Sequence, residues 1–216
     1  MCWSATADLA AGSAIAAIGV ACLVRVRRAR DLPLAALPLL LGIHQIVESA
    51  VWRSGGGTGA DVTAWAVIAL PLLALWVPLG VLLAAPRSAR RRLVLPAAAG
   101  LAAAATLAIC MARRPVMAEV RGHTVGYAVH LPDPSLVIVG YLVATIGSLL
   151  LAGDPLLRLL GAVTAAGAAV CLLLWRLEFA STWCAFAAAS SVLMLIWVRR
   201  GPAGGASPGC EPGEVR

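Results

Sequence analysis

Three polar side chains inside one apolar stretch are the strongest sign of chemistry in this sequence. His44, Gln45 and Glu48 lie between Leu32 and Trp52, and His44, Glu48 and Trp52 repeat every fourth residue. On an α-helix this spacing places those three side chains on one face, with Gln45 beside them. The pattern is typical of a metal-ligand pair, a proton-handling dyad or a polar substrate pocket. Interhelical hydrogen bonds that hold a bundle together are the structural alternative.

A second polar group separates the last two apolar stretches and includes Glu178, Trp183 and Cys184. We expect Cys184 in the first turn of the last helix. Glu178 should face the same side of the protein as Glu48, so that the two carboxylates share a metal, a proton or the Arg176 guanidinium. The alternative is an interfacial loop that carries an exposed ion pair.

The third group is the N-terminus, where Cys2 and Ser4 lie close together. Removal of the initiator methionine would leave Cys2 with a free amine and a thiol, which together make a nucleophile with its own base or a bidentate metal ligand. A disulfide from Cys2 to Cys184 is a second interpretation, because extracytoplasmic compartments are oxidising. A thiol without a role is the third.

Composition restricts the class of protein. The 216 residues are 61% hydrophobic and only 12% charged, whereas soluble domains carry about 25% charged residues. The arginines that give the net charge of +7 cluster at the ends of apolar stretches, so we expect the lipid bilayer, and not nucleic acid, as the partner. No lysine is present, which excludes a retinal Schiff base and a P-loop.

Seven apolar stretches are each close to the roughly 20 residues that span a bilayer. They cover residues 5–23, 32–52, 62–85, 93–112, 136–152, 156–175 and 181–198. The sequence therefore predicts an all-α polytopic membrane protein with one seven-helix domain, residues 1–198, and a disordered cytoplasmic tail, residues 199–216. Between the fourth and fifth stretches, residues 117–130 alternate apolar and polar side chains around Gly122, which predicts a β-hairpin over the mouth of the bundle.

The arginines also predict the orientation. If the N-terminus is outside and the C-terminus is cytoplasmic, only five of the 17 basic residues are outside, and the other twelve are inside, as the positive-inside rule requires. The five expected outside are Arg53, Arg113, Arg114, Arg121 and Arg176.

Three parts of the sequence carry a resemblance to a known family. They are the start Met1-Cys2-Trp3-Ser4-Ala5, the stretch from Gly42 to Glu48 with Trp52, and Glu178 with the stretch from Ser181 to Phe186. Together they resemble an uncharacterised bacterial family of small multi-pass membrane proteins, over residues 1 to about 198. The resemblance implies a seven-helix membrane fold, here in the bacterial plasma membrane, and no known activity.

These observations predict one polar pocket beneath the outer face. Its candidate residues are Cys2, Ser4, His44, Gln45, Glu48, Trp52, Glu178, Trp183 and Cys184. We favour a non-enzymatic protein that binds or passes a small polar ligand or ion, because only one histidine lies clearly inside an apolar stretch and no nucleophile–base–orienter set is visible. The alternative is a metal-assisted or thiol-based membrane enzyme that uses His44 and Glu48 with Cys2 or Cys184. A metal ion, if bound, would use His44, Glu48 and Glu178.

Overall fold

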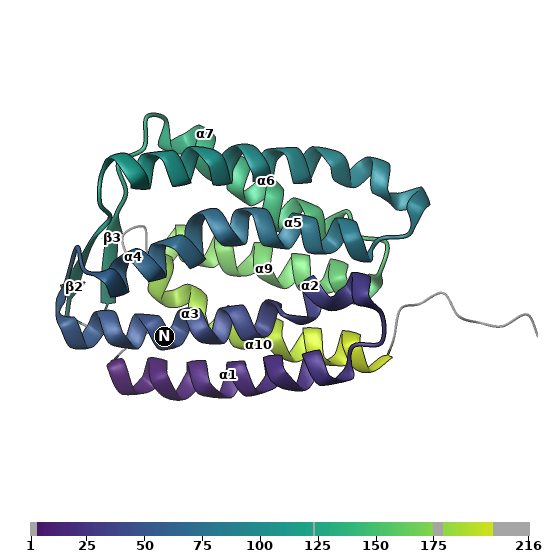
Figure 1. Cartoon of the computed structure of the whole chain (residues 1–216), viewed down its shortest axis with the longest axis horizontal. Coiled ribbons are helices and arrows are strands. Elements are labelled where there is room, and N and C mark those ends of the chain that lie inside the picture. Colours follow the sequence, from purple (N-terminus) through teal and green to yellow (C-terminus); the bar gives the residue numbers. More distant parts are fainter. Residues whose placement is uncertain (1–3, 123, 175–178, 201–216) are drawn as a thin grey trace, which may run out of the picture.

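The computed structural model describes residues 4–122, 124–174 and 179–200, and their side chains except those of 171–174 and 179–185. Within these ranges seven helical segments lie side by side in a bundle (Figure 1). The helical segments match the seven apolar stretches of the sequence, with ends that differ by a few residues. The predicted helical architecture is therefore confirmed.

The first two segments are packed closely together. Helix α1, Ala5–Arg25, begins at Ser4, whose hydroxyl accepts a hydrogen bond from the Ala7 amide at 3.2 Å. The second segment consists of a 3₁₀ turn η1, Ala29–Asp31, a short helix α2, Leu32–Ala35, and helix α3, Leu37–Ser54. Helix α3 ends at Gly55, which has a φ of 78°, a left-handed conformation that suits glycine.

Two segments contain a π-helical turn. In the third segment, π-helix η2, Ile68–Leu72, separates α4, Ala60–Val67, from α5, Leu73–Ala84. In the fifth, π-helix η3, Val143–Gly147, separates α7, Pro134–Leu142, from α8, Ser148–Leu150. Pro71 lies inside η2 and has no amide hydrogen to donate, which disturbs regular helical bonding there. Such π turns are often found at functional sites.

The remaining segments are α6, Arg87–Arg113, α9, Pro155–Leu174, and α10, Phe179–Arg200. Successive segments run in opposite directions, so the ends of the bundle differ. We call the end where α1 begins and α3 ends the sheet end, because a small β-sheet lies there (Figure 1). The opposite end, where α1 ends and α6 begins, is the arginine end. Arg27, Arg91 and Arg199 are among its exposed side chains.

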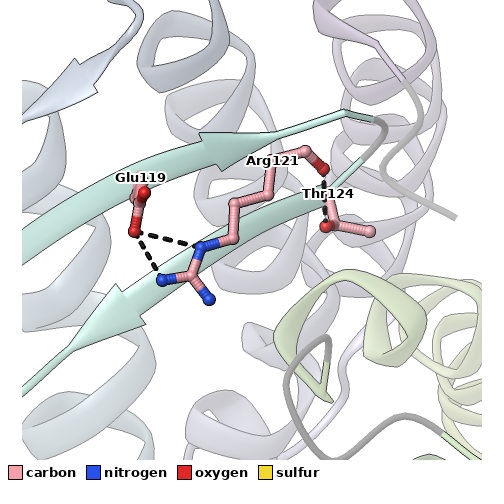
Figure 2. A network of polar contacts seen from close by, with 3 residues as sticks. All are labelled: Glu119, Arg121 and Thr124. Atoms are coloured by element: carbon pink, nitrogen blue, oxygen red, sulfur yellow. Dashed lines mark hydrogen bonds and ion pairs between the residues drawn. The ribbon is translucent and has the colours of Figure 1, made fainter.

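A three-stranded antiparallel sheet lies at the sheet end. Strands β2, Met117–Arg121, and β3, Thr124–Ala128, form the predicted hairpin, and β1, Gly56–Gly57, pairs with the outer edge of β2. Figure 2 shows two contacts of the hairpin: Arg121 pairs with Glu119 of the same strand, and the Thr124 hydroxyl of β3 donates to the carbonyl of Arg121 at 3.0 Å. The hairpin is confirmed, while β1 and hence the third strand were not predicted.

Small residues let the helices approach closely, as their frequency in the sequence indicates. A Cβ added at Gly19 would lie 2.2 Å from the amide nitrogen of Leu39, and one added at Gly12 would lie 2.9 Å from the carbonyl oxygen of Gly42. A Cβ added at Gly100 of α6 would lie 2.3 Å from the carbonyl oxygen of Ala74. These contacts are backbone against backbone, so the interfaces of α1 with α3 and of α5 with α6 require glycine.

Among the described residues, four helical segments are long and apolar enough to cross a membrane: Ala5–Arg25, Ala29–Ser54, Ala60–Ala84 and Arg87–Arg113. The outer surface of the bundle also carries large apolar side chains. Leu95 is 72% exposed, Leu101 60% and Leu136 69%. Large apolar side chains with this exposure suit a helix surface that contacts lipid.

Candidate functional site

A layer of buried polar side chains lies near the sheet end. Asp8 of α1 and Glu48 of α3 are fully buried, Gln45 is 1% exposed and Ser49 is 2% exposed. The Gln45 amide donates a hydrogen bond from Nε2 to Oδ1 of Asp8 at 2.9 Å. We call Asp8, Gln45, Glu48 and Ser49 the polar layer. It brings two carboxyl groups into an otherwise apolar interior.

Close packing of two helices positions this layer. Gly12 lies one helical turn beyond Asp8, and it meets α3 at Gly42, three residues before Gln45. A larger residue at either glycine would push the two helices apart and lengthen the distance from Asp8 to Gln45. Asp8 also lies in the first turn of α1, where the helix dipole favours a negative charge.

Aromatic rings from α3, α4 and β3 pack together near the sheet end. The His44 ring lies 5.0 Å from the Trp65 ring of α4, centroid to centroid, at an angle of 42°. Trp65 stacks on Tyr127 of β3, with centroids 3.4 Å apart and planes 3° apart. Within the described part of the chain, Nε2 of His44 and Nε1 of Trp65 are buried and have no hydrogen-bond partner. Nitrogens of this kind are usually hydrogen-bonded when they are buried. The His44 and Trp65 rings therefore have hydrogen-bonding capacity that the described residues do not use.

The structure places some predicted site residues in this region and not others. Gln45 and Glu48 are in the polar layer, and His44 and Trp52, both partly buried, lie on the same helix. Ser4 is exposed, and its hydroxyl caps α1. Its hydroxyl therefore serves the start of a helix and is not part of the buried layer.

The other predicted site residues cannot be compared with the structure. Cys2 and Glu178, and the side chains of Trp183 and Cys184, lie outside the described residues. Their convergence with His44 and Glu48, and the disulfide, stay predictions. For the part of the chain that is described, no three His, Cys, Asp or Glu side chains are grouped so that they could hold a metal ion. The proposed metal set included Glu178, so it too stays a prediction.

Sequence reasoning missed Asp8. Its signal was an acidic residue inside the first apolar stretch, since residues 5–23 contain no other charged side chain. Aspartate is common near helix N-termini because it caps the helix and interacts favourably with the helix dipole. Asp8 was therefore not selected as a candidate site residue. Only the packing of α1 on α3 shows that the side chain faces inward and meets Gln45.

The polar layer has the chemistry of a site for positive charge. Burying a carboxylate is costly unless it is protonated, paired or hydrogen-bonded. Two carboxyl groups in one layer increase this cost, because a second negative charge raises the energy of the first. Such an arrangement favours uptake of a proton or a cation.

The comparisons with known proteins point to a family and to no activity. The model of a family described as a family of unknown function, DUF6629, matches residues 1–208. No curated protein and no solved structure matches the chain.

Proposed function

The chain belongs to DUF6629, a family of unknown function, and we propose that it is a membrane protein that binds or passes a small cation. The protein would lie in the bacterial plasma membrane and cross it seven times, with its N-terminus outside and its C-terminus in the cytoplasm. The cation would bind at the sheet end, which then faces outward.

Two features support insertion in a membrane. Four of the described helical segments have the length and apolarity of membrane spans, and side chains such as Leu101 and Leu136 point their apolar surface outward. The distribution of arginines supports the orientation. Exposed arginines are concentrated at the arginine end, which the positive-inside rule assigns to the cytoplasm.

One observation carries the choice of a cation: Asp8 and Glu48, both fully buried, share a layer with Gln45. Intramembrane carboxyl groups are costly and commonly mark ion or proton pathways. A single cation would offset the charge of both carboxylates, and a polar oxygen from Gln45 or Ser49 would complete its coordination. The ligand is small, because the layer is packed between two helices in backbone contact.

The experiment compares cation binding by two variants that carry the same Glu-to-Gln change at different positions, one buried and one exposed. The protein is purified in detergent, and its thermal unfolding is followed in buffers that contain Na⁺, K⁺, methylammonium or tetramethylammonium as the only added cation, at several pH values. We expect one small cation to raise the unfolding temperature saturably, because a ligand that binds only the folded state stabilises it. Glu48→Gln should abolish this rise.

The control is Glu119→Gln, which makes the same chemical change on the exposed hairpin, where the Glu119 side chain is 64% exposed. It should leave the cation effect unchanged. Proteoliposomes with a gradient of the effective cation then separate binding from passage. If no cation stabilises the protein beyond the effect of ionic strength, or if Glu48→Gln and Glu119→Gln behave alike, the proposal is wrong.

A further inference from the structure

A small cavity lies at mid-depth in the bundle, away from the polar layer. Its volume is about 60 Å³, and leucine and valine side chains of α3, α5 and α9 form much of its wall. Four residues that carry a hydroxyl group also line it: Tyr141, Thr145, Thr164 and Ser190. A water molecule needs about 15 Å³ of such space, so the cavity has room for about four non-hydrogen atoms.

Three of these hydroxyl groups have already used their hydrogen atom. The Tyr141 hydroxyl donates to the carbonyl of Ala69 at 2.7 Å. The Thr145 hydroxyl donates to the carbonyl of Tyr141, and the Thr164 hydroxyl to that of Leu160, each at 2.8 Å. A hydroxyl that donates its only hydrogen keeps lone pairs that can accept. These three hydroxyl groups therefore offer acceptors, which suit a ligand that donates.

The two π turns adjoin this cavity and explain part of its lining. Thr145 belongs to η3, and Leu73, which follows η2, lies in the wall. The Leu73 amide donates to the carbonyls of Ile68, five residues back, and of Leu70, and not to that of Ala69. The Ala69 carbonyl instead receives the Tyr141 hydroxyl. The π turns thus help to position Thr145 and Leu73 in the cavity wall.

We propose that this cavity binds a small neutral hydrogen-bond donor of the short-chain alcohol class, with about four non-hydrogen atoms. The hydroxyl of the ligand would donate to Thr164 or Thr145, and its alkyl part would contact the leucine and valine side chains. A neutral ligand is favoured because none of the described residues that line the cavity is acidic or basic, and an unpaired charge there would be costly. The inference does not depend on the cation site, because the two sites share no residue.

Fluorine NMR of the intact protein provides the test. The sequence has two tyrosines, Tyr141 in the cavity wall and Tyr127 in the stack at the sheet end, so 3-fluorotyrosine labelling gives two signals, which Tyr127→Phe assigns. Titration with 1-propanol should shift the Tyr141 signal saturably, with a Kd on the order of millimolar, as expected for so few atoms. The Tyr127 signal should stay in place.

Matched ligands and variants test the chemistry. Methoxyethane has the same number of non-hydrogen atoms but no donor, and 1-propylammonium adds a charge; both should bind about tenfold more weakly. Thr164→Val should weaken 1-propanol binding about three- to tenfold, the usual effect of one hydrogen bond, and Ala187→Leu should block binding by filling the cavity. Thr63→Val is the control, because Thr63 is exposed and makes the same kind of bond to Gly59 at 3.1 Å.

Three results would overturn the proposal: no shift of the Tyr141 signal, equal shifts of both tyrosine signals, or a Tyr141 shift unchanged by both Thr164→Val and Ala187→Leu. Equal shifts would indicate that the alcohol partitions into the detergent around the protein. None of these results bears on the cation effect of Glu48→Gln, so failure of one proposal is distinguishable from failure of the other.

Discussion

Gly42 of α3 and Ala16 of α1 meet backbone to backbone: a Cβ added at Gly42 would lie 2.4 Å from the amide nitrogen of Ala16. We predict that Gly42→Ala lowers the free energy of unfolding by about 1–3 kcal/mol, as overpacking does in well-packed interiors. The measurement is thermal or denaturant unfolding in a mild detergent.

Gly140→Ala of α7 is the matched control. A Cβ there would lie 3.9 Å from the Cβ of Ala103, which is an ordinary contact, and alanine favours helix over glycine by up to about 1 kcal/mol. Gly140→Ala should therefore be neutral or stabilising. Equal destabilisation by the two substitutions would mean that α1 and α3 do not pack as described.

The hydrogen bond between Asp8 and Gln45 should contribute measurable coupling. In a double-mutant cycle with Asp8→Ala and Gln45→Ala, we expect a coupling energy of about 0.6–1.7 kcal/mol, the range measured for interhelical hydrogen bonds in membrane proteins. Unfolding of the four proteins under one condition gives the value. A coupling energy of zero would mean that the Gln45 amide does not stabilise the Asp8 carboxylate.

The disulfide between Cys2 and Cys184 stays a sequence-based prediction that mass spectrometry can test. We expect the intact protein to gain two hydrogen masses on reduction, because both thiols would lie on the oxidising side of the membrane. After unfolding without reductant, the other four of the six cysteines should take up alkylating reagent. Uptake at Cys2 and Cys184 as well would contradict the disulfide and favour free thiols.

The orientation predicts opposite labelling at the two ends of the bundle. In a background without the native cysteines, Glu119→Cys on the hairpin should react with a membrane-impermeant maleimide in intact cells. Arg91→Cys at the arginine end should react only after the membrane is permeabilised. Both positions are exposed, so a difference reports the side of the membrane and not burial. The reverse pattern would invert the topology.

The helical segments were predictable because their signals are local. Apolar stretches of about 20 residues, most of them followed by an arginine, predict each helix to within a few residues, and the alternation around Gly122 predicted the hairpin. Strand β1 was not predictable, since Gly56 and Gly57 have no side chains to form a pattern. The π turns were not predicted either, because Pro71 lies in an apolar stretch that otherwise predicts a regular helix.

The polar layer was predictable only where its residues share one helix. Gln45 and Glu48 stood out because a single apolar stretch contains both. Asp8 did not, because its role depends on contact with a residue 37 positions away. Ser4, predicted as a pocket residue, is exposed, and its hydroxyl accepts a hydrogen bond from an amide of the first turn of α1.

The contact of α1 with α3 has a consequence for the order in which the protein is made. Residues 5–54 contain both helices, their glycine contacts and the Asp8–Gln45 hydrogen bond. This pair can therefore form as a helical hairpin as soon as the second segment leaves the ribosome, before the other five are synthesised. Asp8 would then enter the bilayer with its partner already beside it, which lowers the cost of transferring a carboxyl group from water into lipid.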